Sequence, residues 1–137
     1  MNYNCEEKFV NDFINPSYRD RLLFELKSQK KRLNALMRFS HNIDGLLING
    51  KIYSILKKFD YSTLKSFLNE QELYVISFKF LNGAIMSVTE VLEYLDNEYM
   101  PVIVCGNNIA VIKKEFEKCS DNYYLLKNQV SKIGLLK

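Results

Sequence analysis

Residues 102–113 read Val102-Ile103-Val104-Cys105-Gly106-Asn107-Asn108-Ile109-Ala110-Val111-Ile112-Lys113. Two apolar runs rich in β-branched residues flank a short Gly-Asn-Asn turn, a pattern typical of a β-hairpin. The run 73–80 is equally dense in aromatic and β-branched residues and predicts another strand, and Asn82-Gly83 predicts a tight turn into a short strand at 84–86. With one more strand at 123–127, the second half of the chain is expected to form a small, mainly antiparallel sheet.

Helical patterns concentrate in the first half. Apolar residues spaced by three and four predict a helix over 6–14, which Asn15-Pro16 ends because the residue before proline is steered out of the helical region. A longer helix is predicted over 18–39. Its apolar stripe is interrupted over 27–32, which leaves a bend or a break as an alternative to a continuous helix.

Two further helices are predicted beyond this region. A brief one covers 62–68, and a longer one follows the capping box of Ser87 and Glu90, with an apolar stripe of Val88, Val91, Leu92, Leu95 and Tyr99. The stretch 46–58 is ambiguous, because Asn49-Gly50 suits a two-residue hairpin whereas the apolar spacing after it also fits a helix.

These elements predict an α+β fold in which N-terminal helices pack on one face of the sheet. The chain of 137 residues has only five glycines and two prolines, and no linker divides it, so residues 1–137 are expected to form a single domain. The polar, acidic N-terminus does not resemble a secretory signal, and the apolar runs are too short to cross a membrane. Three widely spaced cysteines fit reduced thiols, so we expect a cytoplasmic protein that acts without a membrane.

Motifs for catalysis are missing from the sequence. The single histidine, His41, excludes a site built from two imidazoles, and no Cys-x-x-Cys pair or glycine-rich phosphate loop occurs. His41 is expected at the end of a helix, and Cys105 in the core. We therefore expect no catalytic residue, no metal, no cofactor and no small-molecule substrate, and we predict that the chain is not an enzyme.

Charge is distributed unevenly although the net charge is only +3. Residues 19–38 carry seven basic and two acidic side chains, and residues 70–100 carry six acidic and one basic. The acidic residues of the helix after Ser87 occupy its non-apolar faces and predict a surface that binds a cationic partner: Glu90, Glu93, Asp96 and Glu98. The alternative surface is a basic face that could follow the phosphates of a nucleic acid: Lys27, Lys30, Lys31, Arg32 and Arg38.

The segment Lys30-Lys31-Arg32-Leu33-Asn34-Ala35-Leu36-Met37-Arg38-Phe39-Ser40-His41-Asn42, together with the hairpin 102–112, resembles small immunity proteins of bacterial contact-dependent growth inhibition and related polymorphic toxin systems. The resemblance extends over most of the chain in size and composition and includes the Arg-Phe-Ser-His-Asn neighbourhood at 38–42.

This resemblance implies a cytoplasmic, non-enzymatic protein that binds the C-terminal domain of a cognate toxin, often a nuclease, and blocks its active site. Such proteins share no universal functional motif, so the resemblance assigns no residue a role. Many of them are acidic, whereas this chain is mildly basic. The small nucleic-acid-binding protein remains the second hypothesis.

Overall fold

The computed structural model describes residues 2–69, 71–77, 82–98, 100–114 and 123–128. Its elements in chain order are α1 (Tyr3–Phe13), α2 (Pro16–Leu26), α3 (Arg32–His41), α4 (Ile43–Leu46), the 3₁₀ turn η1 (Asn49–Lys51), β1 (Ile52–Leu56), α5 (Tyr61–Leu68), β2 (Leu73–Ile76), β3 (Ile85–Met86), α6 (Val88–Asn97), β4 (Val102–Cys105), β5 (Ile109–Lys113) and β6 (Tyr123–Lys127).

The strands form one six-stranded sheet in the order β1-β6-β5-β4-β2-β3, and every neighbouring pair is antiparallel. The hairpin of β4 and β5, the short strand β3 after Gly83, and β6 confirm the sequence-based prediction. β2 covers the first half of the predicted strand 73–80, and residues 78–80 lie outside the described residues. The α+β class is thereby confirmed.

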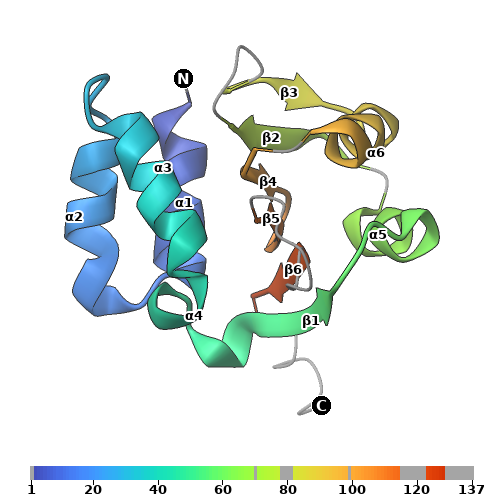
Figure 1. The fold of residues 1–137 in the computed structure, drawn as a ribbon, viewed down its shortest axis with the longest axis horizontal. Helices are drawn as coiled ribbons and strands as arrows, with labels where there is room; N and C mark the ends of the chain where they lie inside the picture. The colour runs from blue at the N-terminus through green and yellow to red at the C-terminus, as the bar shows by residue number, and fades with distance from the viewer. Residues whose placement is uncertain (1, 70, 78–81, 99, 115–122, 129–137) are drawn as a thin grey trace.

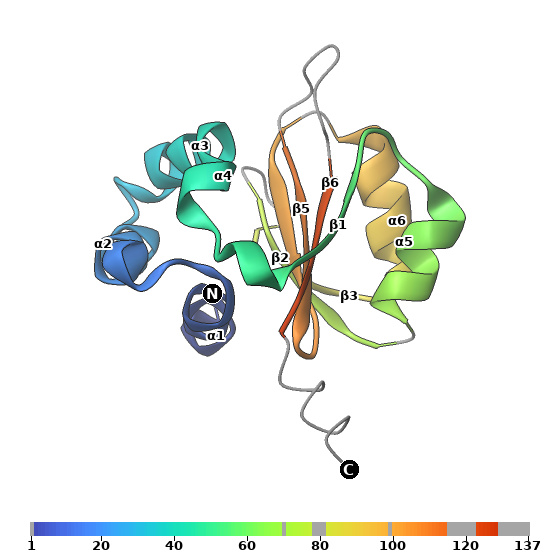
Figure 2. The same ribbon diagram turned by 90° about the horizontal axis from the view of Figure 1, so that it is seen from below.

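Helices cover both faces of this sheet, not one as we expected (Figures 1 and 2). The layer of α1 to α4 lies on one side, and α5 and α6 lie on the other. The reason lies in the strands, since β2 and β6 each contain four consecutive buried residues. Along β5, Ala110 and Ile112 enter the core beneath α1 to α4, and Val111 enters the core beneath α5 and α6. A strand that is apolar on both sides needs a cover on both sides.

The ambiguous stretch 46–58 forms neither a two-residue hairpin nor a helix. Asn49 and Gly50 belong to η1, which leads into β1, and β1 pairs with β6 from the far end of the chain. One strand of the sheet therefore comes from the first half of the chain. Leu47 makes only an isolated bridge to Ile14.

The predicted long helix 18–39 is broken into α2 and α3, and the break coincides with the gap in its apolar stripe. Residues 27–31 connect the two helices, and a hydrogen bond from the amide of Arg32 to the carbonyl of Ser28 starts the new helix. The turn reverses the chain direction, so α3 packs back on α2 (Figure 1). No helix among the described residues is long and apolar enough to span a bilayer.

Candidate functional site

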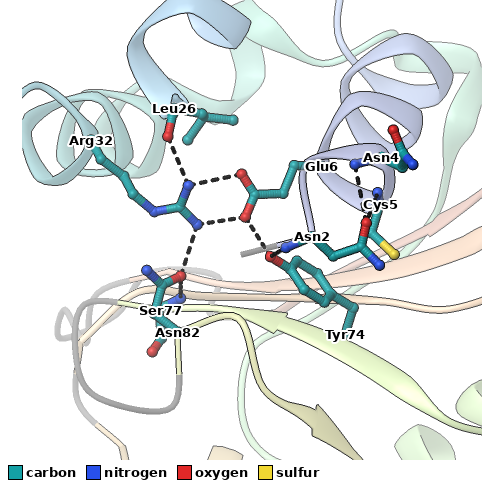
Figure 3. Close-up of polar contacts among 9 residues, drawn as sticks. All are labelled: Asn2, Asn4, Cys5, Glu6, Leu26, Arg32, Tyr74, Ser77 and Asn82. Atoms are coloured by element: carbon teal, nitrogen blue, oxygen red, sulfur yellow. Dashed lines mark hydrogen bonds and ion pairs between the residues drawn. The ribbon is translucent and has the colours of Figure 1, made fainter. Parts of the chain in front are cut away.

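Arg32, which we predicted on an exposed basic face, is buried at the junction of the helical layer and the sheet (Figure 3). Its guanidinium binds the Glu6 carboxylate through two hydrogen bonds of 2.8 and 2.6 Å. It also donates to the carbonyl of Leu26 at the end of α2 and to the side chain of Asn82. The Arg32 side chain is 7% exposed and that of Glu6 is 1% exposed, so nothing outside the protein can use this charge.

The Glu6 carboxylate receives a third hydrogen bond, from the Tyr74 hydroxyl at 2.7 Å. Burial and this bond raise the pKa of Tyr74. Burial by itself lowers the pKa of Arg32, but the hydrogen-bonded Glu6 carboxylate outweighs it and the net pKa is raised. The Arg32 guanidinium therefore stays charged, and the cluster ties α1, α3 and β2 together.

The remaining four residues of the predicted basic face are exposed, and two of them have partners on α2. Arg38 binds Glu25 of α2, and the Lys31 ammonium lies 5.0 Å from the ring centre of Phe24. Lys27 and Lys30 are exposed in the connection between α2 and α3. Burial thus removes Arg32 from the predicted basic face, and the other four residues of that face stay exposed.

Three of the four predicted acidic residues lie exposed on α6: Glu90, Glu93 and Asp96. Glu90 closes the capping box with Ser87, whose hydrogen bonds hold the pKa of Glu90 below its usual value. Glu98 is buried instead and accepts a hydrogen bond from the amide of Met100. Its placement in the acidic face was wrong, because α6 ends at Asn97 and the chain turns inward.

The Lys113 ammonium donates to the carbonyls of Leu95 and Glu98 at the end of α6. Burial lowers the pKa of Lys113. A lysine from β5 therefore offsets the negative end of the α6 dipole, which we had expected an external cation to do.

A groove of about 370 Å³ lies between α2 and α3. Its deepest residues are apolar, with Ala35 and Phe39 buried and Leu22 half-buried. Charged residues surround this floor, with Arg21, Glu25 and Arg38 on the two helices and His41 at the end of α3. The Arg-Phe-Ser-His-Asn neighbourhood at 38–42 is one part of the segment 30–42 that carries the resemblance, and four of its five residues line this groove.

The Glu25 carboxylate is shared by two arginines. Arg38 reaches it across the groove, and the Arg21 Nε lies 3.4 Å from it on α2. Two guanidiniums and one carboxylate leave the groove with a net positive charge over an apolar floor. Partly exposed aromatic rings and arginine are the residue types that contribute most to binding at protein interfaces.

Large apolar side chains are also exposed on the same two helices: Tyr18, Phe24 and Leu33. Phe24 is 64% exposed, which is unusual for a phenylalanine. Sequence reasoning missed this surface, although one signal was present. Leu22, Leu23, Phe24 and Leu26 cover more than one side of a helix, so a helix that packs on one side only must expose some of them.

Among the described residues no group of three or more His, Cys, Asp or Glu side chains could hold a metal ion. Cys5 and Cys105 are free thiols, and Cys105, which we expected inside the core, is partly buried and packs against its edge. His41 ends α3 as predicted, and Cys119 lies outside the described residues.

No family model matches the chain, and no curated protein or solved structure is similar to it.

Proposed function

We propose that this chain is a cytoplasmic immunity protein that binds a cognate toxin domain, most often a nuclease in such systems, and blocks its active site. The observation that carries the proposal is the groove between α2 and α3, with its apolar floor and its arginine-rich rim. Residues of the Arg-Phe-Ser-His-Asn neighbourhood at 38–42, which belongs to the resemblance to immunity proteins, line this groove and support the proposal. The chain acts by occlusion and not as an enzyme.

The chemistry of the groove describes the partner surface that fits it. An apolar side chain fills the space above Phe39, and a carboxylate beside it pairs with Arg21 or Arg38. A carboxylate of the partner competes with Glu25 for these guanidiniums. When this carboxylate is buried at the interface, a buried charge-assisted hydrogen bond replaces the exposed ion pair with Glu25. Contacts of this kind set specificity and association rate, and the buried apolar anchor sets the dissociation rate.

A second contact surface is the exposed acidic part of α6, formed by Glu90, Glu93 and Asp96. It lies on the other side of the sheet from the groove (Figure 2). A basic nuclease that met this surface would use the charge pattern predicted from the sequence. The groove and the acidic part of α6 lie on opposite sides of the sheet, so we expect one partner domain to contact only one of them. Variants in each surface therefore distinguish the two.

The test is binding to the C-terminal toxin domain encoded immediately upstream, measured by biolayer interferometry and by rescue of growth when both are expressed together. The wild-type chain is expected to bind with a dissociation constant of about 1 nM or below and to restore growth. Tyr18→Ala and Arg38→Ala should each weaken binding by roughly thirtyfold, the effect of losing an interface residue worth about 2 kcal/mol.

The matched control is the pair Glu93→Gln and Asp96→Asn, which removes two charges from α6 without changing side-chain size and should leave binding within about threefold. The reverse result, in which only the α6 variants weaken binding, moves the contact to α6. If no complex forms and the toxin still kills, the immunity function is wrong. Retention of the chain on DNA or RNA that falls steeply with salt would then favour the nucleic-acid alternative.

A further inference from the structure

A second concave surface of about 700 Å³ lies on the opposite face of the sheet, where α5 crosses β1 and β6. Side chains from α5, β1 and the β4–β5 turn line it together. It shares no lining residue with the groove between α2 and α3. This α5 pocket is formed from segments far apart in the chain, so no local motif could have revealed it.

A β-bulge directs two consecutive side chains of β1 into the α5 pocket. Ile52 pairs with Leu126 and Ser54 pairs with Leu125, so Tyr53 is the extra residue between them. In a regular strand neighbouring side chains point to opposite faces, but here Tyr53 and Ser54 both line the pocket. Bulges that turn a side chain toward a site are frequent at sheet edges, and β1 is an edge strand.

The Tyr53 ring organises this side of the pocket. It stacks on Phe67 of α5 with the ring centres 5.5 Å apart, and the Lys127 ammonium lies 5.0 Å from its centre. The aromatic ring thus holds the ammonium of β6 at the pocket wall. Because Phe67 and Lys127 already engage the ring, little of its face is left for stacking an uncharged sugar.

The two loops at the other side are held in place by Gln71. The side-chain nitrogen of Gln71 donates to the backbone carbonyl of Leu68. The side-chain oxygen of Gln71 accepts a 2.7 Å hydrogen bond from the backbone amide of Asn107. Gly106 permits this contact, because a Cβ there would lie 2.8 Å from the Gln71 oxygen. The pocket wall is therefore positioned before any ligand arrives, which lowers the entropic cost of binding.

Backbone strain accumulates at the same place. Asn69 and Asn108 are the non-glycine residues with positive φ in the described part of the chain, at 57° and 61°. Asn69 lines the α5 pocket, and Asn108 follows Asn107, which also lines it. Such conformations occur in ligand-binding loops and also in tight turns, where asparagine adopts them more readily than other non-glycine residues.

The chemistry of the lining indicates the ligand class. It offers the hydroxyls of Ser54, Ser62, Thr63 and Ser66 and the amides of Asn69 and Asn107. Among the residues that the structure describes, Lys127 is the one formally charged member of the lining, and no described carboxylate belongs to it. We propose that the α5 pocket binds a small phosphorylated polyol, of the sugar phosphate class, with its phosphate on Lys127 and its hydroxyl groups on the serine and amide side chains.

The proposal is tested by titrating the isotope-labelled full chain with ribose 5-phosphate, ribose and inorganic phosphate and following amide resonances by NMR. Ribose 5-phosphate is expected to shift the amides of Ser54, Ser66 and Asn107 saturably, with a dissociation constant of roughly 1 mM or tighter, as about 0.3 kcal/mol per non-hydrogen atom implies. Ribose alone and phosphate alone should each bind at least about tenfold more weakly.

Lys127→Gln should weaken binding by roughly tenfold or more, because it removes a charge-assisted hydrogen bond, and Lys127→Arg should restore it. Lys65→Gln is the matched control, since Lys65 lies on α5 outside the pocket lining and should leave the affinity within about twofold. An unchanged melting temperature shows that each variant is folded.

The proposal is overturned if ribose 5-phosphate shifts no pocket amide, if Lys127→Gln binds as the wild type does, or if inorganic phosphate alone binds as tightly as the sugar phosphate. None of these readings depends on a toxin domain, so they are separable from the immunity proposal.

Discussion

Arg32 shows how much the position of a single charged residue matters in this protein. It stands in a run of basic residues, yet its side chain is buried against Glu6, Leu26 and Asn82. Removing two charges from water costs several kcal/mol, and only near-complete hydrogen bonding offsets this. Nearly all polar atoms of the buried pair are hydrogen-bonded, because Arg32 binds Glu6 through two hydrogen bonds and the Tyr74 hydroxyl donates to the same carboxylate. The exception is Arg32 Nε, which has no partner among the described residues.

Arg32→Met is expected to destabilise the protein by about 3–5 kcal/mol, because it leaves the Glu6 carboxylate buried without a cation. The double variant Glu6→Leu with Arg32→Met should be more stable than Arg32→Met alone, since it buries no charge. Urea denaturation followed by circular dichroism at neutral pH measures both free energies of unfolding.

Arg38→Met serves as the control for this comparison. The Arg38 side chain is 47% exposed, so its ion pair with Glu25 should contribute about 1 kcal/mol or less. Equal losses for Arg32→Met and Arg38→Met would show that burial of the Arg32 pair does not control stability.

Among the secondary-structure elements, α6 follows its local sequence most closely. The Ser87 hydroxyl accepts from the amide of Glu90, and the Glu90 carboxylate accepts from the amide of Ser87. Val91, Leu92 and Leu95 then cover the sheet. Both the start of the helix and its buried face were predicted from these residues.

Ser87→Ala is expected to cost about 1 kcal/mol of stability by removing the cap, and Ser87→Thr should retain most of it. Thermal denaturation at neutral pH measures the difference. No measurable loss in Ser87→Ala would mean that packing alone holds the start of α6.

The cap also predicts a pH dependence. The pKa of Glu90 is lowered from 4.5 in the folded protein, so its contribution is complete above that value and is lost as the pH falls through the folded pKa. Glu90→Gln should therefore flatten the acidic side of the stability–pH profile, and an unchanged profile would contradict the role of the carboxylate.

α2 and α3 illustrate the opposite situation, in which an interrupted pattern changes the architecture. The gap over 27–32 was visible in the sequence, but the pattern alone did not distinguish a bend from a reversal. Arg32 decides this, because reaching Glu6 brings the start of α3 back beside the end of α2. The reversal also creates the groove, since it places Leu22 of α2 beside Phe39 of α3.

In the whole molecule, two cores share one sheet. Leu36 of α3 packs in the first core, and Leu92 of α6 packs in the second. Alternate residues of the same strands enter the two cores. If the strands separate in one core, the apolar residues of the other core are therefore exposed as well.

Leu36→Ala and Leu92→Ala are each expected to destabilise the protein by about 2–5 kcal/mol, and unfolding should remain a single transition in both. Native-state hydrogen exchange checks this, since amides of α3 and α6 should lose protection together. A variant in which the layer of α1 to α4 melts first while α6 stays protected would contradict the coupling.

The sequence by itself determined the helices α1, α5 and α6, the strands of the second half and the cap of α6, because periodicity, turn residues and capping act over a few neighbouring positions. The acidic residues Glu90, Glu93 and Asp96 were likewise placed correctly on an exposed helix side. Glu98 was not, since the end of α6 turns it inward.

Only the tertiary structure decided that the sheet is covered on both faces, that β1 pairs with β6, and that Arg32 is buried. These outcomes depend on contacts between residues far apart in the chain, such as Arg32 with Glu6 and Ser54 with Leu125. A local pattern shows which side of an element is apolar, but the free energy of burial is settled by what packs against that side. For the same reason, no sequence motif predicted the groove or the α5 pocket, because each is lined by residues from separate segments of the chain.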